Sequence, residues 1–247
     1  MATPDRSEWL ETRSPPSHCR ETPSRSHEVS GSGIIEQSPA HRHAVTKDHA
    51  PTRSELPAIV DVWQFALRGD SLRERSMLLW ADVLPVLALR CGCSASELRI
   101  ERSANGKPKV SGWSGSFSLS HDDDVGLLAI ADVRRLGVDV MAQRGMQHPA
   151  RLAKRVFGAA ELVRWERAAL DEQRRELRIR FCVIEAVVKA LDWRLWPALG
   201  GVHVMANGAT ARVPQRRATL QVRSGDIGDH SYAIVADCPL DVRWMSK

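Results

Sequence analysis

Hydrophobic residues along this chain follow two different spacings. Apolar side chains recur every three or four positions in four stretches, which predicts helices at residues 71–89, 151–156, 161–170 and 176–191. Short alternating or continuous apolar runs predict strands at residues 98–102, 116–120, 125–131, 136–140, 203–205, 219–222, 232–236 and 242–244. Each half of the pattern combines helices with an antiparallel-style run of strands, so we expect an α+β fold of two similar halves.

Two local signals refine this pattern. Pro85 lies inside the first helical stretch, where its missing N–H predicts a kink or break. The sequence Asn-Gly-Lys-Pro at residues 105–108 predicts a turn.

The first 52 residues differ in composition from the rest of the chain. They are rich in Ser, Pro, His and charge and have no sustained apolar period, which is typical of a disordered extension. We therefore expect an extension at residues 1–52, a first half at 53–140 and a second half at 141–247. The sequence contains neither a signal-peptide core nor an apolar run of ~20 residues, so a cytoplasmic protein without membrane contact is expected. We also expect a monomer.

Charge and cysteine content narrow the function classes. The net charge is +5, and residues 1–50 hold six basic and seven acidic residues, so the rest of the chain carries +6. A basic body suits an anionic cofactor, an acidic protein or nucleic acid, but no nucleic-acid-binding motif is present. Five scattered cysteines predict no disulfide framework, and the lone pair Cys91 and Cys93 predicts no zinc site.

Four short segments carry candidate chemistry. They are Gly106-Lys107-Pro108, Ser120-His121-Asp122, Gly137-Val138-Asp139-Val140, and Glu185 with Lys189. Each alone has an ordinary explanation as a turn, a surface loop, a strand-end cap or a solvated helical ion pair. Their order and spacing together are more informative.

Taken in order, these segments resemble the Sfp-type 4'-phosphopantetheinyl transferase family. The resemblance rests on GKP at 106–108, FSLSH at 117–121, GVDV at 137–140, FGAAE at 157–161 and FCVIEAVVK at 181–189. It covers about residues 71–196 and implies a pseudo-twofold fold with the active site at the junction of the halves.

The resemblance assigns roles to individual residues. It implies that Asp139 and Glu185 bind Mg²⁺, a hard cation that takes a few carboxylates and several waters. Lys189 lies one turn beyond Glu185 on the same helical face, and the resemblance places it against phosphate as a catalytic residue. The residues that it implies in coenzyme A binding are Lys107, Pro108, Ser120, His121 and Lys189.

A catalytic base is expected at Glu161. In the family a Glu after the Phe lies the same distance before the metal-binding Glu, here 24 residues before Glu185. The alternative is an acid at a helix N-terminus, where the helix dipole favours negative charge. The sequence leaves both open.

Three positions depart from the family pattern. Met141 stands where a second metal carboxylate is expected, and a thioether does not bind a hard cation. Ile184 replaces a Lys, and Phe181 replaces a Trp. We therefore expect two protein carboxylates at the metal.

Two further charged groups are left without an assigned role. Arg68, Arg73 and Arg75 are candidates for the 3'-phosphate of coenzyme A, or a solvated helix face. The acidic run at residues 122–124 is interpreted as a solvated turn and not as a metal site.

The expected function is transfer of 4'-phosphopantetheine from coenzyme A to a serine of an acyl or peptidyl carrier protein. The reaction would be Mg²⁺-dependent and release adenosine 3',5'-bisphosphate, as in a holo-[acyl-carrier-protein] synthase type enzyme. One alternative is a degenerate relative that binds coenzyme A or a carrier without turnover, which Met141 and Ile184 motivate. A nucleic-acid-binding protein with a disordered arm is a third hypothesis, from another class.

Overall fold

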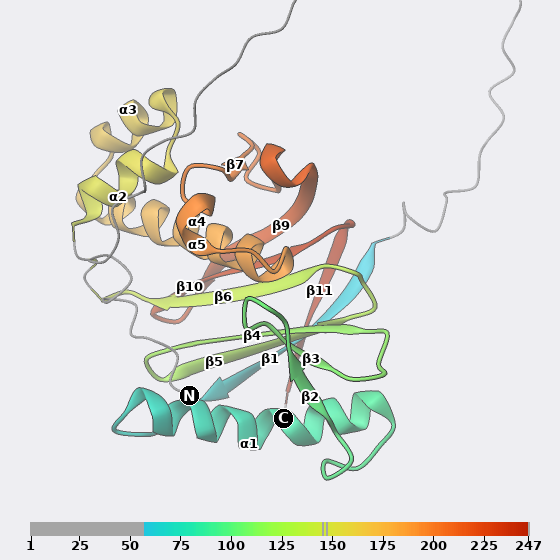
Figure 1. Ribbon diagram of the computed structural model, residues 1–247. Helices are drawn as coiled ribbons and strands as arrows, with labels where there is room; N and C mark the ends of the chain where they lie inside the picture. The colour runs from blue at the N-terminus through green and yellow to red at the C-terminus, as the bar shows by residue number, and fades with distance from the viewer. Residues whose placement is uncertain (1–56, 145, 147, 247) are drawn as a thin grey trace, which may run out of the picture. The chain divides into compact units, whose positions relative to one another are not determined.

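The computed structural model describes residues 57–144, 146 and 148–246 of the chain (Figure 1). The helices are α1 (Leu72–Cys91), α2 (Pro149–Val156), α3 (Ala159–Arg167), α4 (Leu170–Ala190) and α5 (Leu195–Ala198), with a 3₁₀ turn at Pro214–Arg216. The strands are β1 (Ala58–Ala66), β2 (Ile100–Arg102), β3 (Pro108–Val110), β4 (Ser116–Asp122), β5 (Val125–Ala131), β6 (Leu136–Ala142), β7 (His203–Val204), β8 (Thr210–Val213), β9 (Ala218–Ile227), β10 (His230–Ala236) and β11 (Leu240–Met245). The predicted extension at 1–52 lies outside the described residues.

Two sheets form the centre of the described structure. The first has the order β11-β1-β5-β4 and the second the order β6-β10-β9-β8-β7, while β2 and β3 form a separate hairpin. The strand pairs are antiparallel except for β1 and β11, which run parallel. This arrangement confirms the α+β class predicted from the sequence.

The sheets and the two long helices form four layers (Figure 1). Leu79, Val83 and Leu87 of α1 pack on the outer face of the first sheet, with Phe65 and Phe117. A second apolar cluster from β1, β5, β6 and β10 fills the space between the sheets. The third and largest cluster lies between α4 and the second sheet. Each sheet is thus covered by one long helix.

The strand pairing does not follow the expected halves at 53–140 and 141–247. That boundary falls inside β6, which pairs with β10 in the second sheet. The last strand, β11, returns to the first sheet and pairs with β1. Both ends of the described chain therefore meet in the first sheet.

A kink or break at Pro85 was predicted, and the break is wrong because α1 runs continuously from Leu72 to Cys91. Pro85 is exposed, so the backbone carbonyl that loses its helical partner lies on the solvent side. The buried face of α1 holds the helix across this position. Ser71 caps its start by accepting the Glu74 N–H at 3.1 Å.

Side chains of β4 bind the edge of β6 that does not pair with β10. Three β6 N–H groups donate to them: Val138 to Ser118 Oγ (3.0 Å), Val140 to Ser120 Oγ (3.3 Å) and Ala142 to Asp122 Oδ2 (3.0 Å). The numbers rise together on both strands, so β4 and β6 run parallel. We call this contact the β4–β6 seam, and it joins the two sheets.

Gly137 lets α4 approach β6 closely. A Cβ built at Gly137 would lie 1.9 Å from the carbonyl oxygen of Ala186 and 2.9 Å from the backbone nitrogen of Ala190. Both atoms belong to the helix backbone, so no side-chain movement can relieve the clash. The short distance between strand and helix therefore depends on glycine at this position.

Substitution Gly137→Ala is expected to destabilise the protein by about 3 kcal/mol, because α4 must move away from β6. Gly200→Ala is the matched control, since a Cβ there meets no atom within 4 Å. It should change the free energy of unfolding by less than about 0.5 kcal/mol. Urea unfolding of the full chain measures both, and equal stabilities would contradict the close approach.

Candidate active site

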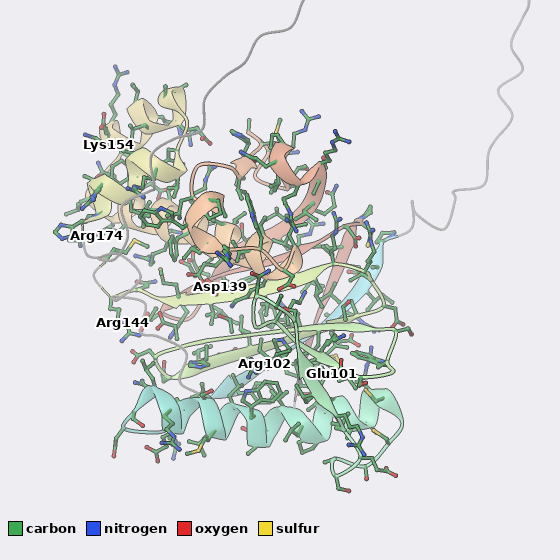
Figure 2. The ribbon with its side chains drawn as sticks, viewed as in Figure 1. Glu101, Arg102, Asp139, Arg144, Lys154 and Arg174 are labelled. Atoms are coloured by element: carbon green, nitrogen blue, oxygen red, sulfur yellow. The ribbon has the colours of Figure 1, made fainter. Side chains whose placement is uncertain are left out.

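Asp139 lies on β6 with its side chain fully buried (Figure 2). Its Oδ1 accepts hydrogen bonds from Ser120 Oγ at 2.7 Å and from Lys189 Nζ at 2.8 Å. Lys189 also donates to the backbone oxygen of Val138 at 2.9 Å. A buried carboxylate is stable only when paired and hydrogen-bonded, and this one receives both a cation and a hydroxyl.

Helix α4 brings Glu185 and Lys189 to the same place. The two residues lie four apart, so they occupy one face of the helix one turn apart, and both side chains are half-buried. The opposite side of α4 is apolar, with Ile184 and Val187 fully buried against the second sheet. Burial of that stripe fixes the rotation of α4 and places Glu185 on the same helical face as Lys189, which contacts Asp139.

Lys107 reaches the same region from the β2–β3 hairpin. Its Nζ donates to the backbone oxygen of Leu136 at 2.9 Å, at the start of β6. Burial lowers the pKa of Lys107 to about 8; the charge of Asp192 opposes this shift and that of Lys189 adds to it. Lys107 and Lys189 therefore lie close enough to repel each other.

The hairpin turn is held by the end of α4. Ser103 Oγ donates to Asp192 Oδ1 at 2.7 Å, and Asn105 Nδ2 donates to the Asp192 backbone oxygen at 2.8 Å. Asp192 has a positive φ of 47°, which turns the chain sharply after α4. These three residues were missed by the sequence analysis; the only local signal was the Asn-Gly turn itself.

The remaining predicted cofactor residues occupy different places. Pro108 is the first residue of β3, directly after Lys107. His121 is half-buried on β4 and alternates with Ser120, so it lies on the face that carries Phe117 and Leu119 toward α1. The structure thus brings Ser120 to Asp139 and Lys107 to the start of the same strand, whereas His121 lies on the other face of β4.

A solvated turn was predicted for the acidic run at 122–124, and this prediction is wrong for Asp122. Asp122 is buried because it accepts the Ala142 N–H at the seam and pairs with Arg144. Asp123 pairs with Arg75 at 3.2 Å. Arg75, one candidate for the coenzyme 3'-phosphate, is therefore engaged with this turn.

The donor set fits a hard divalent cation that keeps several waters. Asp139 on β6 and Glu185 on α4 would supply its carboxylate oxygens. Lys189 lies one turn from Glu185 on α4 and contacts Asp139 at 2.8 Å. Within residues 57–144, 146 and 148–246, no group of three or more His, Cys, Asp or Glu side chains forms a metal cluster. Two protein carboxylates are consistent with magnesium, which rarely has an all-protein cage.

Comparison with protein families points the same way. Residues 135–235 match the model of the 4'-phosphopantetheinyl transferase superfamily. The matched segment begins just before Asp139 and contains Glu161, Glu185 and Lys189. A search of curated proteins found no match.

No helix in the described part of the chain is long and apolar enough to span a membrane.

Glu161 lies at the N-terminus of α3. One carboxylate oxygen accepts the Gly158 N–H at 3.0 Å, and the other pairs with Arg180 of α4. The Arg180 guanidinium is buried and lies 5.0 Å from the ring centroid of Phe157. This geometry matches the helix-terminus alternative, and the base role of Glu161 stays a prediction.

The three departures from the family pattern are packing residues. Ile184 is fully buried in the cluster beneath α4. Met141 and Phe181 are half-buried and pack against the same cluster. Met141 shares the face of β6 that carries Asp139, because the two positions are two residues apart.

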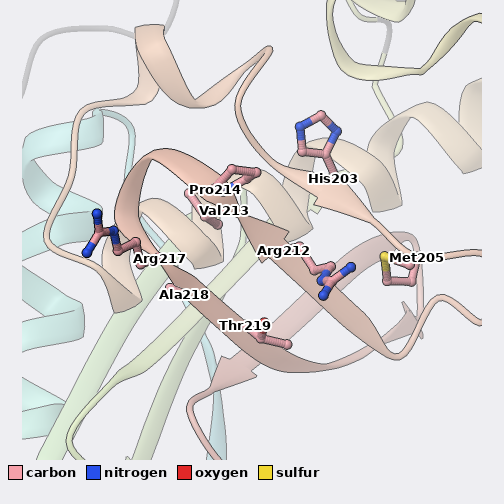
Figure 3. Close-up of a pocket in the computed structure, with 8 residues that line it drawn as sticks. All are labelled: His203, Met205, Arg212, Val213, Pro214, Arg217, Ala218 and Thr219. Atoms are coloured by element: carbon pink, nitrogen blue, oxygen red, sulfur yellow. The ribbon is translucent and has the colours of Figure 1, made fainter. Parts of the chain in front are cut away.

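A separate cavity of about 480 Å³ lies over β7, β8 and β9 (Figure 3). Arg212, Arg217 and His203 line it above an apolar floor that includes Val213. It shares no residue with the cluster around Asp139. This cavity is therefore not part of the candidate active site around Asp139.

Substitution Lys189→Met should destabilise the protein by about 2 kcal/mol, because it removes the cation from a buried carboxylate. Lys109→Met is the control, since Lys109 pairs with Glu101 at 3.0 Å but both side chains are at least half exposed. Its cost should stay below about 0.5 kcal/mol. Urea unfolding compares them, and equal losses would show that Lys189 contributes no more than a surface ion pair.

Proposed function

We propose that this protein is an Sfp-type transferase that moves 4'-phosphopantetheine from coenzyme A to a serine of an acyl or peptidyl carrier protein. The carrying observation is that Ser120 and Lys189 both contact Asp139 while Lys107 binds the Leu136 backbone at the start of the same strand. These residues lie within and beside the segment that matches the superfamily. The monomeric state and cytoplasmic location remain predictions from the sequence.

The two lysines suit the phosphates of coenzyme A. An ammonium group has three N–H donors. Within the described residues, Lys107 donates one to Leu136 and Lys189 donates two, to Val138 and Asp139. Each lysine can therefore bind a phosphate oxygen while it stays attached to β6. Charge-assisted hydrogen bonds of this kind are about twice as strong as neutral ones.

The reaction is a phosphoryl transfer. The serine oxygen of the carrier forms a bond to the phosphorus next to pantetheine, and the bond from that phosphorus to adenosine 3',5'-bisphosphate breaks. Asp139 and Glu185 would hold Mg²⁺, which supplies charge neutralisation at the pyrophosphate. Lys189 adds positive charge at the transferred group and keeps Asp139 in place.

Glu161 is the proposed acceptor of the serine proton. Its two oxygens contact Gly158 and Arg180 in the described structure, so it must exchange one of these contacts to take a proton. The alternative is a structural acid that joins α3 to α4 through Arg180. Glu161→Gln separates the two when turnover is measured per folded molecule, because only the base role predicts that the folded variant turns over more slowly.

The second candidate function is binding without turnover. Met141 and Ile184 favour it, because a carboxylate and a cation of the family pattern are missing at these positions. Both residues pack into the apolar cluster, so they leave the contacts of Lys107, Lys189 and Asp139 in place. The assay below decides between the two functions.

The full chain should add the mass of 4'-phosphopantetheine to an apo carrier protein in the presence of coenzyme A and Mg²⁺, detected by mass spectrometry. Asp139→Asn and Glu185→Gln should each lower the rate by about a hundredfold or more, because each removes a metal-binding carboxylate. Asp171→Asn is the control, since its side chain is 98% exposed on α4. It should leave the rate unchanged.

A wild-type protein that binds coenzyme A but modifies no member of a panel of fatty-acid, polyketide and nonribosomal-peptide carriers would support the binding function. Near-normal rates in Asp139→Asn or Glu185→Gln, with circular dichroism showing intact folds, would exclude these residues from the mechanism.

Binding of coenzyme A in the absence of metal should weaken as the pH rises. With a pKa of about 8, Lys107 is mostly protonated at pH 7 and mostly neutral at pH 9. If only the cation binds phosphate, the affinity falls by about tenfold over this range. Isothermal titration calorimetry should show this slope in the wild type and in Lys109→Met, and lose it in Lys107→Met. A slope that persists in Lys107→Met would assign the titration to another group.

A further inference from the structure

We propose that Ser120 is a positioning residue for the metal-binding carboxylate of Asp139 and makes no direct contact with coenzyme A. This inference rests on the proposed metal site. It differs from the role that the sequence resemblance implies for Ser120, which is coenzyme binding. The geometry at the β4–β6 seam carries it.

The hydroxyl of Ser120 has one proton, and that proton is already used. Ser120 Oγ donates it to Asp139 Oδ1 at 2.7 Å. The same oxygen accepts the Val140 N–H at 3.3 Å. An ionised phosphate oxygen is only an acceptor, so it needs a donor that Ser120 can no longer offer. Ser120 is also only 5% exposed, which separates it from a solvated ligand.

The two hydrogen bonds of Ser120 fix the carboxylate relative to its own strand. Val140 and Asp139 are neighbours on β6, so Ser120 binds the backbone and the side chain of one short segment. Lys189 donates to the same oxygen, Oδ1, from α4. Two donors on one oxygen set the plane of the carboxylate, which decides where it can bind a cation. Residues that orient metal ligands in this way typically affect metal affinity by about 10- to 100-fold.

Ser118 provides a matched control position within the seam. It lies two residues earlier on β4, is 3% exposed and accepts the Val138 N–H at 3.0 Å. Its hydrogen bond joins the two strands as that of Ser120 does. Because Val138 carries no carboxylate, loss of the Ser118 hydroxyl weakens the seam alone.

Two binding measurements on the full chain test this role without turnover. Mn²⁺ binding is followed by electron paramagnetic resonance in the absence of coenzyme A. Coenzyme A binding is followed by calorimetry in the presence of EDTA. The proteins are the wild type, Ser120→Ala, Ser118→Ala, Ser120→Thr and Asp139→Asn.

Ser120→Ala should weaken Mn²⁺ binding by about tenfold or more, because the carboxylate loses one of the two donors that orient it. Its metal-free affinity for coenzyme A should stay within about twofold of the wild type. Ser118→Ala should keep both affinities within about twofold of the wild type. Its melting temperature should nevertheless fall by about as much as that of Ser120→Ala, because each variant loses one seam hydrogen bond. Ser120→Thr keeps the hydroxyl and should retain most of the Mn²⁺ affinity.

Three results would overturn the proposal, and each has a different cause. Weaker coenzyme A binding in Ser120→Ala with unchanged Mn²⁺ affinity would return Ser120 to the coenzyme site. Equal Mn²⁺ losses in Ser118→Ala and Ser120→Ala would show a general loosening of the seam. Wild-type Mn²⁺ affinity in Asp139→Asn would show that Asp139 does not bind the metal, and this would also contradict that part of the proposed function.

Discussion

The free edge of β6 imposes the constraint on which this structure depends. Backbone N–H and C=O groups at a buried sheet edge need partners, and β10 satisfies only the other edge. Side chains supply them on the β4 side. Ser118, Ser120 and Asp122 accept the N–H groups, while Lys107 and Lys189 donate to the carbonyl oxygens of Leu136 and Val138. Two of the residues that complete the sheet edge, Lys107 and Lys189, are thus also charged residues of the candidate site.

This arrangement explains why the candidate site forms where the two sheets meet. The seam fixes the position of β6 along β4, and the contact between Gly137 and the Ala186 carbonyl fixes the distance of α4 from β6. Asp139 lies between the two contacts and shares its face of β6 with Gly137. The end of α4 then holds the β2–β3 hairpin through Asp192, which brings Lys107 in. Most of these contacts involve backbone atoms, so the path of the chain sets the spacing of the charged groups.

The sequence predicted the elements that carry their own hydrophobic period, such as β5 at Val125–Ala131 and most of α4. It missed β1, where the polar Asp61 interrupts an apolar run. Asp61 is buried because Arg90 of α1 and Arg243 of β11 pair with it, and neither partner is local. The motif residues were found, but their contacts were not. Whether Ser120 faces Asp139 or a ligand depends on the register between β4 and β6, which no local pattern encodes.

The charge balance of the site bears on the loss of a carboxylate at position 141. The proposed site contains two carboxylates, Asp139 and Glu185, and two lysines, Lys107 and Lys189, so its net charge is zero when both lysines are protonated. A divalent cation would then make the site net positive, which suits a pyrophosphate group. A third carboxylate would reduce that positive charge by one unit beside the anion. Met141 instead packs against the cluster beneath α4. Under the proposed function, Met141 gives up one metal ligand and in return leaves a more favourable field for the phosphates of the substrate.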